Sequence, residues 1–210
     1  HKIGKVPACH CIATSSIPLA LDAGTDHIEH CSFMAADTTW RFDEAIARRV
    51  AEAGVYVTPT IQTGADSMVR MQERYAQGIA TPQEAEIVVT TPHRTAESIA
   101  NARYLHELGV PLVAGNDAGW RYTRFDNFYR ELQFLAEAGM APLGAIHAAT
   151  GRAAAACQLA DRLGTLAAGQ VADLIAVRPD PTGDLAALRD PALVMQGGAV
   201  VVDRRGAGAA

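Results

Sequence analysis

Two histidines and an aspartate lie at or just after the ends of apolar runs, and their side chains are of types that bind metals or transfer protons. His10 ends the apolar run VPACH, His30 ends DHIEH, and Asp117 follows the run VPLVAG after one asparagine. Zinc and similar divalent metals bind neutral imidazole and carboxylate at about 2.0–2.2 Å. A catalytic metal site also keeps a position for water, from which a nearby carboxylate can take a proton. His10, His30 and Asp117 are therefore candidate metal ligands, and Asp117 is the candidate catalytic residue.

Each of these residues also has an ordinary structural explanation. A histidine at a strand end is often a hydrogen-bonded structural side chain, and an aspartate that opens a loop is often a turn former. Arg121 and Tyr122 follow Asp117 closely and could line a substrate pocket, with Arg121 able to hold a carboxylate. A solvated loop is the plainer explanation for both. Spacing alone leaves these alternatives open.

A parallel sheet would bring the three candidate ligands to one edge, because active sites gather at the carboxyl ends of parallel strands. Short apolar runs alternate with helical patterns and predict strands at residues 6–10, 26–30, 55–60 and 110–115. Continuous apolar strands between helices indicate a parallel sheet covered on its faces. An open doubly wound sheet and a (β/α)8 barrel both fit this pattern. The first strand is followed by no glycine-rich phosphate loop, which weakens a dinucleotide-binding interpretation.

Capping residues, glycines and prolines set the expected ends of the helices. The pattern predicts helices at 14–24 and 42–54, a mostly helical stretch over 66–108 broken near Pro82 and Pro92, helices at 127–138 and 142–150, and a short one from Arg152.

The chain changes character after Asp161. A strand is expected at 171–177, and the glycine pair 197–198 predicts a hairpin. We therefore expect two parts, an α/β part over 1–160 and a β-rich appendage over 161–210.

Composition narrows the class of protein. The chain has 210 residues, of which 49% are hydrophobic and 20% charged, with a net charge of −5. No basic patch suggests a nucleic-acid partner, and no apolar run is long enough to cross a membrane. No signal-peptide pattern opens the sequence. Its four cysteines lack zinc-knuckle spacing, so we expect reduced, buried thiols in a cytoplasmic protein.

Six segments together resemble the amidohydrolase superfamily of metal-dependent hydrolases, in its imidazolonepropionase-like and prolidase-like (Xaa-Pro or Xaa-Arg dipeptidase) branch. They are VPACHC, AGTDHIEHC, VYVTPTIQTG, GVPLVAGNDAG, AIHAATGRAA and GTLAAGQVADLIAV, and they extend to about residue 178. The resemblance implies an α/β fold. The chain would form the C-terminal half of a (β/α)8 TIM-like barrel, with four βα units at 1–160, plus strands of a small β-sandwich at 161–210.

The resemblance also implies roles for the candidate residues. His10 and His30 match the metal histidines of barrel strands five and six. Asp117 matches the strand-eight aspartate, which binds metal and exchanges protons with the hydrolytic water. The implied cofactor is Zn²⁺ or another divalent metal, and the implied substrate is a dipeptide or other small amide. Ala13 stands where deaminases of the superfamily carry a glutamate, which favours dipeptidase or cyclic amidase chemistry.

The sequence departs from the family pattern in two ways. The His-x-His pair of strand one and the strand-four lysine are absent. We therefore expect this chain to be the C-terminal portion of a longer protein, or to pair with a copy of itself or with a separate N-terminal half. The alternatives are a non-catalytic remnant with a vestigial pocket and an open doubly wound binding protein. Cys11 and Cys31 replace the small residues that the family usually has beside the two histidines. They would be either soft metal ligands or packed side chains.

Overall fold

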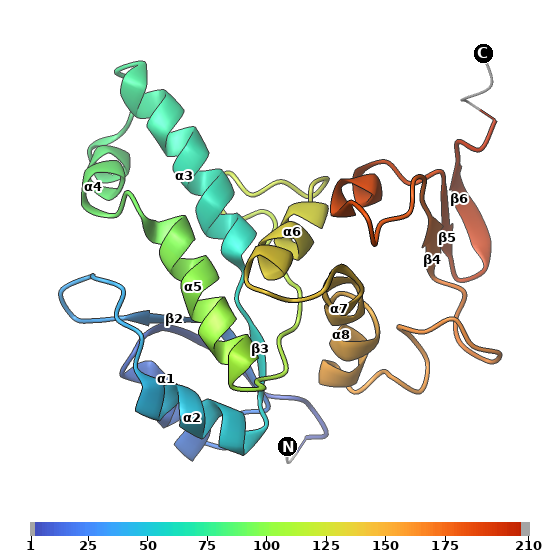
Figure 1. The fold of residues 1–210 in the computed structure, drawn as a ribbon, viewed down its shortest axis with the longest axis horizontal. Helices are drawn as coiled ribbons and strands as arrows, with labels where there is room; N and C mark the ends of the chain where they lie inside the picture. The colour runs from blue at the N-terminus through green and yellow to red at the C-terminus, as the bar shows by residue number, and fades with distance from the viewer. Residues whose placement is uncertain (1–2, 207–210) are drawn as a thin grey trace.

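The first part of the molecule is a small parallel sheet flanked by helices (Figure 1). The computed structural model describes residues 3–206. Strands β1 (Ala8–Ala13), β2 (His27–Met34) and β3 (Tyr56–Thr58) pair in the order β1-β2-β3, and both pairings are parallel. The sheet type is therefore the one that the apolar runs predict.

The fourth predicted strand, residues 110–115, runs beside β3 without forming a regular strand. A single parallel bridge joins Leu112 to Val57. The amide of Val57 donates to the carbonyl of Pro111 at 3.2 Å, and the amide of Val113 donates to the carbonyl of Val57 at 2.8 Å. Four parallel segments therefore lie side by side, although the last is held by few backbone bonds.

Strands β1 and β2 extend past the ends that the sequence predicts. His10 and His30 consequently lie inside strands rather than at their exits, so that expectation was wrong. The end of β2 is irregular, because His30, Cys31 and Phe33 have φ angles of 70°, 48° and 53°. Such left-handed backbone turns the strand, and non-glycine residues adopt it rarely. The pattern of apolar residues in the sequence does not predict this left-handed backbone.

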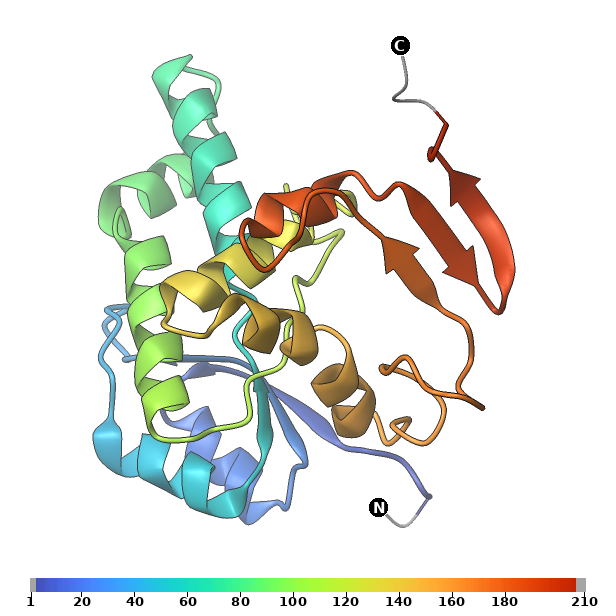
Figure 2. The same cartoon turned by 45° about the vertical axis from the view of Figure 1, so that its right-hand side comes forward.

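Helices pack around the sheet in two groups (Figures 1 and 2). Helices α1 (Ser16–Asp22) and α2 (Glu44–Ala53) lie together on one side. The second group is a long arm of three helices, α3 (Ile61–Ala76), α4 (Pro82–Thr90) and α5 (Arg94–Glu107). The breaks near Pro82 and Pro92 are confirmed, but α3 begins five residues before the predicted start at residue 66.

The C-terminal part adds helices and a second sheet. It contains α6 (Tyr129–Glu137), α7 (Pro142–Ala148), α8 (Gly151–Ala156), the 3-10 helix η1 (Leu185–Arg189), β4 (Leu174–Ala176), β5 (Leu193–Gln196) and β6 (Ala199–Asp203). The strands form an antiparallel sheet that Figure 2 shows set apart from the parallel one. The predicted hairpin at 197–198 is confirmed, and the boundary between 160 and 161 stays a prediction.

One apolar core joins the parallel sheet to its helices. Ile28 and Val57 from the strands, Leu105 from α5 and Leu135 from α6 are at most 1% exposed. Burying side chains of this size stabilises each by roughly 1.5–3 kcal/mol, so the sheet is a firm base for what projects from it. Within residues 3–206, no helix is both long and apolar enough to cross a membrane.

Candidate functional site

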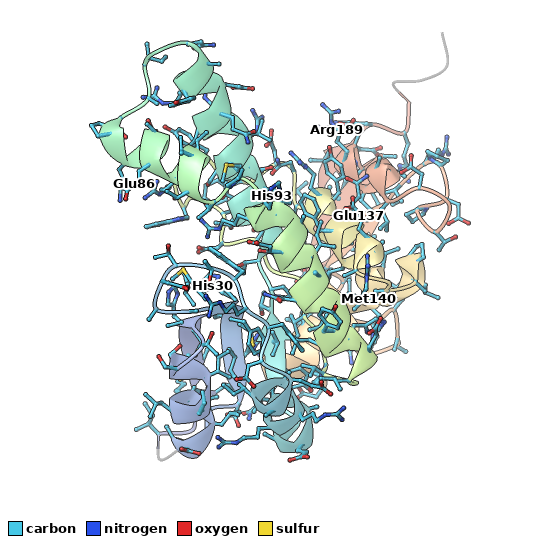
Figure 3. All side chains as sticks on the ribbon, turned by 60° about the vertical axis from the view of Figure 1, so that its left-hand side comes forward. His30, Glu86, His93, Glu137, Met140 and Arg189 are labelled. Carbon is cyan, nitrogen blue, oxygen red and sulfur yellow. The ribbon has the colours of Figure 1, made fainter. Side chains whose placement is uncertain are left out.

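His10 of β1 and His30 of β2 face each other. His10 Nδ1 lies 2.9 Å from His30 Nε2, and the two rings meet edge to face with centroids 4.4 Å apart. His10 is exposed and His30 is half-buried. Figure 3 shows His30 at the end of the sheet that faces the helical arm. The sheet therefore brings together the two histidines that the sequence analysis identifies as candidate ligands, with a ring nitrogen of each facing the other.

A threonine fixes the ring of His30. Thr60 Oγ1 lies 2.6 Å from His30 Nδ1 and 2.8 Å from the carbonyl oxygen of Pro59. A carbonyl only accepts, so the Thr60 hydroxyl donates its proton to Pro59 and must accept from His30 Nδ1–H. This assignment makes His30 Nε2 the acceptor of the hydrogen bond with His10, which His10 Nδ1–H donates. A histidine that donates through its other nitrogen in this way is oriented for metal binding.

The two opposed nitrogens fit part of a metal site. A tetrahedral zinc ion with Zn–N distances near 2.0–2.1 Å places two nitrogen ligands about 3.3 Å apart. The observed separation is 2.9 Å, so a small rotation of the exposed His10 ring would open it enough. Among residues 3–206, however, no three His, Cys, Asp or Glu side chains gather closely enough to hold a metal ion. Within these residues, His10 and His30 alone do not make a complete ligand set.

Asp117 lies near the histidines without joining them in a ligand cluster. It is exposed, its φ is 49°, and it sits just beyond the parallel segment 110–115. Burial and the neighbouring His10 lower the pKa of His30 to about 4, with Arg94 acting in the same direction, while the charge of Asp117 opposes them. Asp117 is thus within electrostatic reach of His30.

The loop that carries Asp117 is tied to the first turn of α3. Thr63 Oγ1 donates to the carbonyl of Asn116, and Asn116 Nδ2 donates to Gln62 Oε1 at 3.1 Å. Thr60, which holds His30, immediately precedes the same turn. One short stretch of chain therefore contacts both His30 and the residue that precedes Asp117.

Two arginines near this site have no carboxylate partner. Arg121 lies over the ring of Trp120, and Arg94 lies over the ring of Trp40, with guanidinium-to-centroid distances of 5.7 and 5.4 Å. In the described part of the chain neither forms an ion pair. Burial and the charge of Arg121 both lower the pKa of Arg94. Two adjacent cations without a counter-charge suit an anionic ligand.

Tyr122 lies elsewhere. Its hydroxyl donates to Glu84 Oε1 at 2.5 Å, and it lines an open cavity of about 440 Å³ together with residues of α3, of its own loop and of α6, among them Asp66, Arg70 and Arg130. His10 and His30 do not line that cavity. The structure therefore does not bring Tyr122 together with the histidines.

The cysteines beside the histidines are packing residues. Cys11 and Cys31 are each 1% exposed, and burial raises the pKa of both thiols, which disfavours the thiolate that a metal would need. All four cysteines are free. Cys157 is exposed, contrary to the expectation that every thiol is buried, because it ends α8 at the surface.

Three residues of this region have no signature in the sequence. Thr60, Arg94 and Glu131 come from a strand exit, the start of α5 and the first turn of α6. Their contacts join segments tens of residues apart, which local periodicity cannot reveal. The one sequence signal that could have pointed to Glu131 is an acidic residue at a position where the amphipathic pattern of α6 predicts burial.

Comparisons with known proteins agree on a family. The model of the amidohydrolase family matches residues 1–201. A provisionally named prolidase from Bifidobacterium longum superposes with a TM-score of 0.79 at 28% identity, over 96% of this chain and 48% of that one. A Xaa-Pro dipeptidase with methionine bound in its active site gives 0.74 at 26% identity, over 92% and 44%.

A third structure, the ochratoxinase of A. niger, shares the fold with a TM-score of 0.73 at 22% identity, over 96% of this chain and 43% of that one. The chain thus spans less than half the length of these structures, as expected for part of a barrel. A comparison with curated proteins gives no match.

Proposed function

The chain belongs to the amidohydrolase family, and from this premise we propose that it carries part of the active site of a metal-dependent hydrolase that cleaves amide bonds in dipeptides or related small amides. One observation carries the proposal, the opposed nitrogens of His10 and His30 at 2.9 Å. Their geometry suits a shared divalent metal, for which zinc is our first choice because imidazole is among its preferred ligands.

We assign separate roles in metal binding and proton transfer to residues of this chain. His10 Nδ1 and His30 Nε2 would hold the metal, with the His30 ring fixed by Thr60. The bound metal would supply polarisation of the amide carbonyl and acidify a water molecule. Asp117 would accept the proton of the attacking water and return it to the departing amine nitrogen. Its position on an exposed loop within electrostatic reach of His30 supports this role.

The arginine pair supports a substrate that carries a carboxylate. Arg94 is within electrostatic reach of His30, Arg121 is within electrostatic reach of Arg94, and neither forms an ion pair among the described residues. A dipeptide has a carboxylate a few bonds away from its amide, and guanidinium groups bind carboxylates with paired hydrogen bonds. We therefore place the carboxylate of the substrate at this pair.

The remaining metal ligands are proposed to come from outside this chain's described residues. The chain spans 44–48% of the prolidase-like structures that it resembles, and its two histidines are half of a four-ligand set. An N-terminal half or a second copy of the chain would supply the rest. A specific observation also favours a second candidate, a non-catalytic remnant, since residues 3–206 hold no complete ligand cluster.

Hydrolysis of an Xaa-Pro and Xaa-Arg dipeptide panel, with zinc supplied, tests the proposal. We expect Asp117→Asn to lower kcat by about 10²–10⁴, the usual contribution of general acid–base catalysis. Asp190→Asn is the matched control, since Asp190 is exposed and only weakly paired. No hydrolysis by the wild-type protein would favour the non-catalytic remnant, whereas hydrolysis with equal kcat in Asp117→Asn would contradict the proton-transfer role of Asp117.

A further inference from the structure

Glu131 is a buried acid that holds the beginning of another helix. It lies in the first turn of α6 and is 0% exposed. Its Oε1 accepts from the amide of Ile61 at 3.1 Å, and its Oε2 accepts from the amide of Gln62 at 2.7 Å. These amides are the first two of α3, which have no partner within their own helix. Glu131 therefore caps α3 from a site 70 residues away.

The cap is needed because the residue before α3 is strained. Thr60 has φ 50° and ψ 42°, a left-handed conformation that is unfavourable for a β-branched residue. Its own side chain makes no capping bond to α3, since the hydroxyl is engaged with Pro59 and His30. Strained backbone of this kind persists only where the surroundings enforce it. Glu131 accepts its two hydrogen bonds from Ile61 and Gln62, the residues that directly follow Thr60.

The capped turn contacts both candidate functional groups. At its start, Thr60 accepts from the ring of His30. Within it, Gln62 and Thr63 hold Asn116, which directly precedes Asp117. A shift of this turn would therefore move the His30 ring and the Asp117 loop together.

We propose that Glu131 is a positioning residue, whose two carboxyl oxygens set the first turn of α3 and through it the orientation of His30 and the Asp117 loop. The inference rests on the proposed function, which assigns His30 as a ligand and Asp117 as the proton-transfer group. Glu131 bonds backbone amides alone and touches neither histidine. Its effect is therefore indirect, and it differs from a simple stabilising cap by altering the state of the His30 ring.

The test compares Glu131→Gln with Glu137→Gln, the same change at the exposed far end of α6 (Figure 3). A glutamine keeps the size but places an amide donor against one of the two backbone donors. In metal-free protein, ¹⁵N NMR of the imidazoles is expected to show His30 protonated at Nδ1. Glu131→Gln should give mixed tautomers and weaken zinc binding about 10–100-fold, the range for loss of groups that orient ligands. Glu137→Gln should change neither.

A second pair of variants covers the case in which Glu131→Gln fails to fold. Thr60→Val removes the hydroxyl that accepts from His30, and Thr60→Ser retains it. We expect the Val variant to lose the Nδ1–H tautomer and zinc affinity, and the Ser variant to keep both. If Thr60→Val behaves like the wild type, the route from Glu131 to His30 does not exist and the proposal is overturned.

The two proposals fail in different ways. The tautomer of His30 is read without metal or substrate, so it does not depend on hydrolysis. Wild-type protein that neither binds zinc nor cleaves dipeptides would contradict the proposed function. A folded Glu131→Gln variant with the wild-type His30 tautomer and zinc affinity would contradict the positioning role alone.

Discussion

The ring of His30 is held from two sides, and this decides what it can bind. Thr60 accepts from Nδ1, and His10 faces Nε2. The sequence predicts that His10 and His30 meet, because parallel strands of similar length bring equivalent positions together. It does not predict Thr60 as the partner, since that contact joins residues 30 positions apart through a left-handed turn.

The pKa of His30 gives a test at this scale. In metal-free protein we expect a pKa of about 4, below the ordinary value of 6.5, mainly because burial disfavours the charged ring. The unfolded chain therefore binds more protons between these values. The stability from this group is complete above about pH 6.5 and is lost as the pH falls toward 4.

NMR titration of the His30 ring carbons measures this value directly. Thr60→Ser, which retains the hydroxyl, should leave the low value in place. A His30 ring that titrates near 6.5 in the folded, metal-free protein would show that it is solvated and would contradict the packing described above.

The ends of the helices show which features of a helix or strand can be predicted from its own sequence. Asp43 accepts from the amide of Ile46 at 3.0 Å, and Gly54 ends α2 with a φ of 64°, as the local pattern predicts. Local chemistry suffices there. The early start of α3 was missed because its cap, Glu131, lies on another helix. The strand predicted at residues 110–115 is not regular, because its apolar run packs beside β3 but forms only one bridge with it.

A glycine in that fourth segment provides a prediction about elements. A methyl group at Gly115 would lie 2.6 Å from Thr58 Cγ2 of β3. Thr58 has little freedom to move, because its hydroxyl lies 2.5 Å from His27 Nε2. We expect Gly115→Ala to lower the free energy of unfolding by about 1–3 kcal/mol, the range for overpacked cores.

Urea denaturation measures this change. The matched control is Gly183→Ala, in an exposed loop where the nearest atom to the added methyl group is 3.7 Å away. A Gly115→Ala variant as stable as the control would show that segment 110–115 does not pack closely on β3.

At the scale of the whole molecule, the sheet has unpaired edges. Within residues 3–206, β1 pairs only with β2, and the strand pairing of segment 110–115 is with β3, beside two hydrogen bonds to Ala148 and Arg152. Ile175, Val200 and Val201 of the antiparallel sheet are 50–55% exposed. Unpaired edges and exposed apolar strands favour association with another chain. The family resemblance predicts a half-barrel with such edges, whereas periodicity alone left an open doubly wound sheet equally possible.

Sedimentation velocity tests the consequence. We expect the purified chain to associate as its concentration rises through the micromolar range, and Val201→Lys to weaken that association by placing charge on the exposed sheet. Asp203→Lys would be a poor control because Asp203 pairs with Arg205, so Glu137→Lys, on α6, is preferred. A chain that stays monomeric throughout would show that these edges need no partner.

Zinc binding tests the central claim most directly. Isothermal titration of zinc into metal-free protein should give weak binding of about one ion per chain, because two histidines are only part of a ligand set, and both His10→Ala and His30→Ala should abolish this binding. His106→Ala, a partly exposed histidine of α5, should leave it intact. Wild-type protein that binds no zinc, or a His30→Ala variant that binds it as well as the wild type, would contradict the assignment of His10 and His30 as metal ligands.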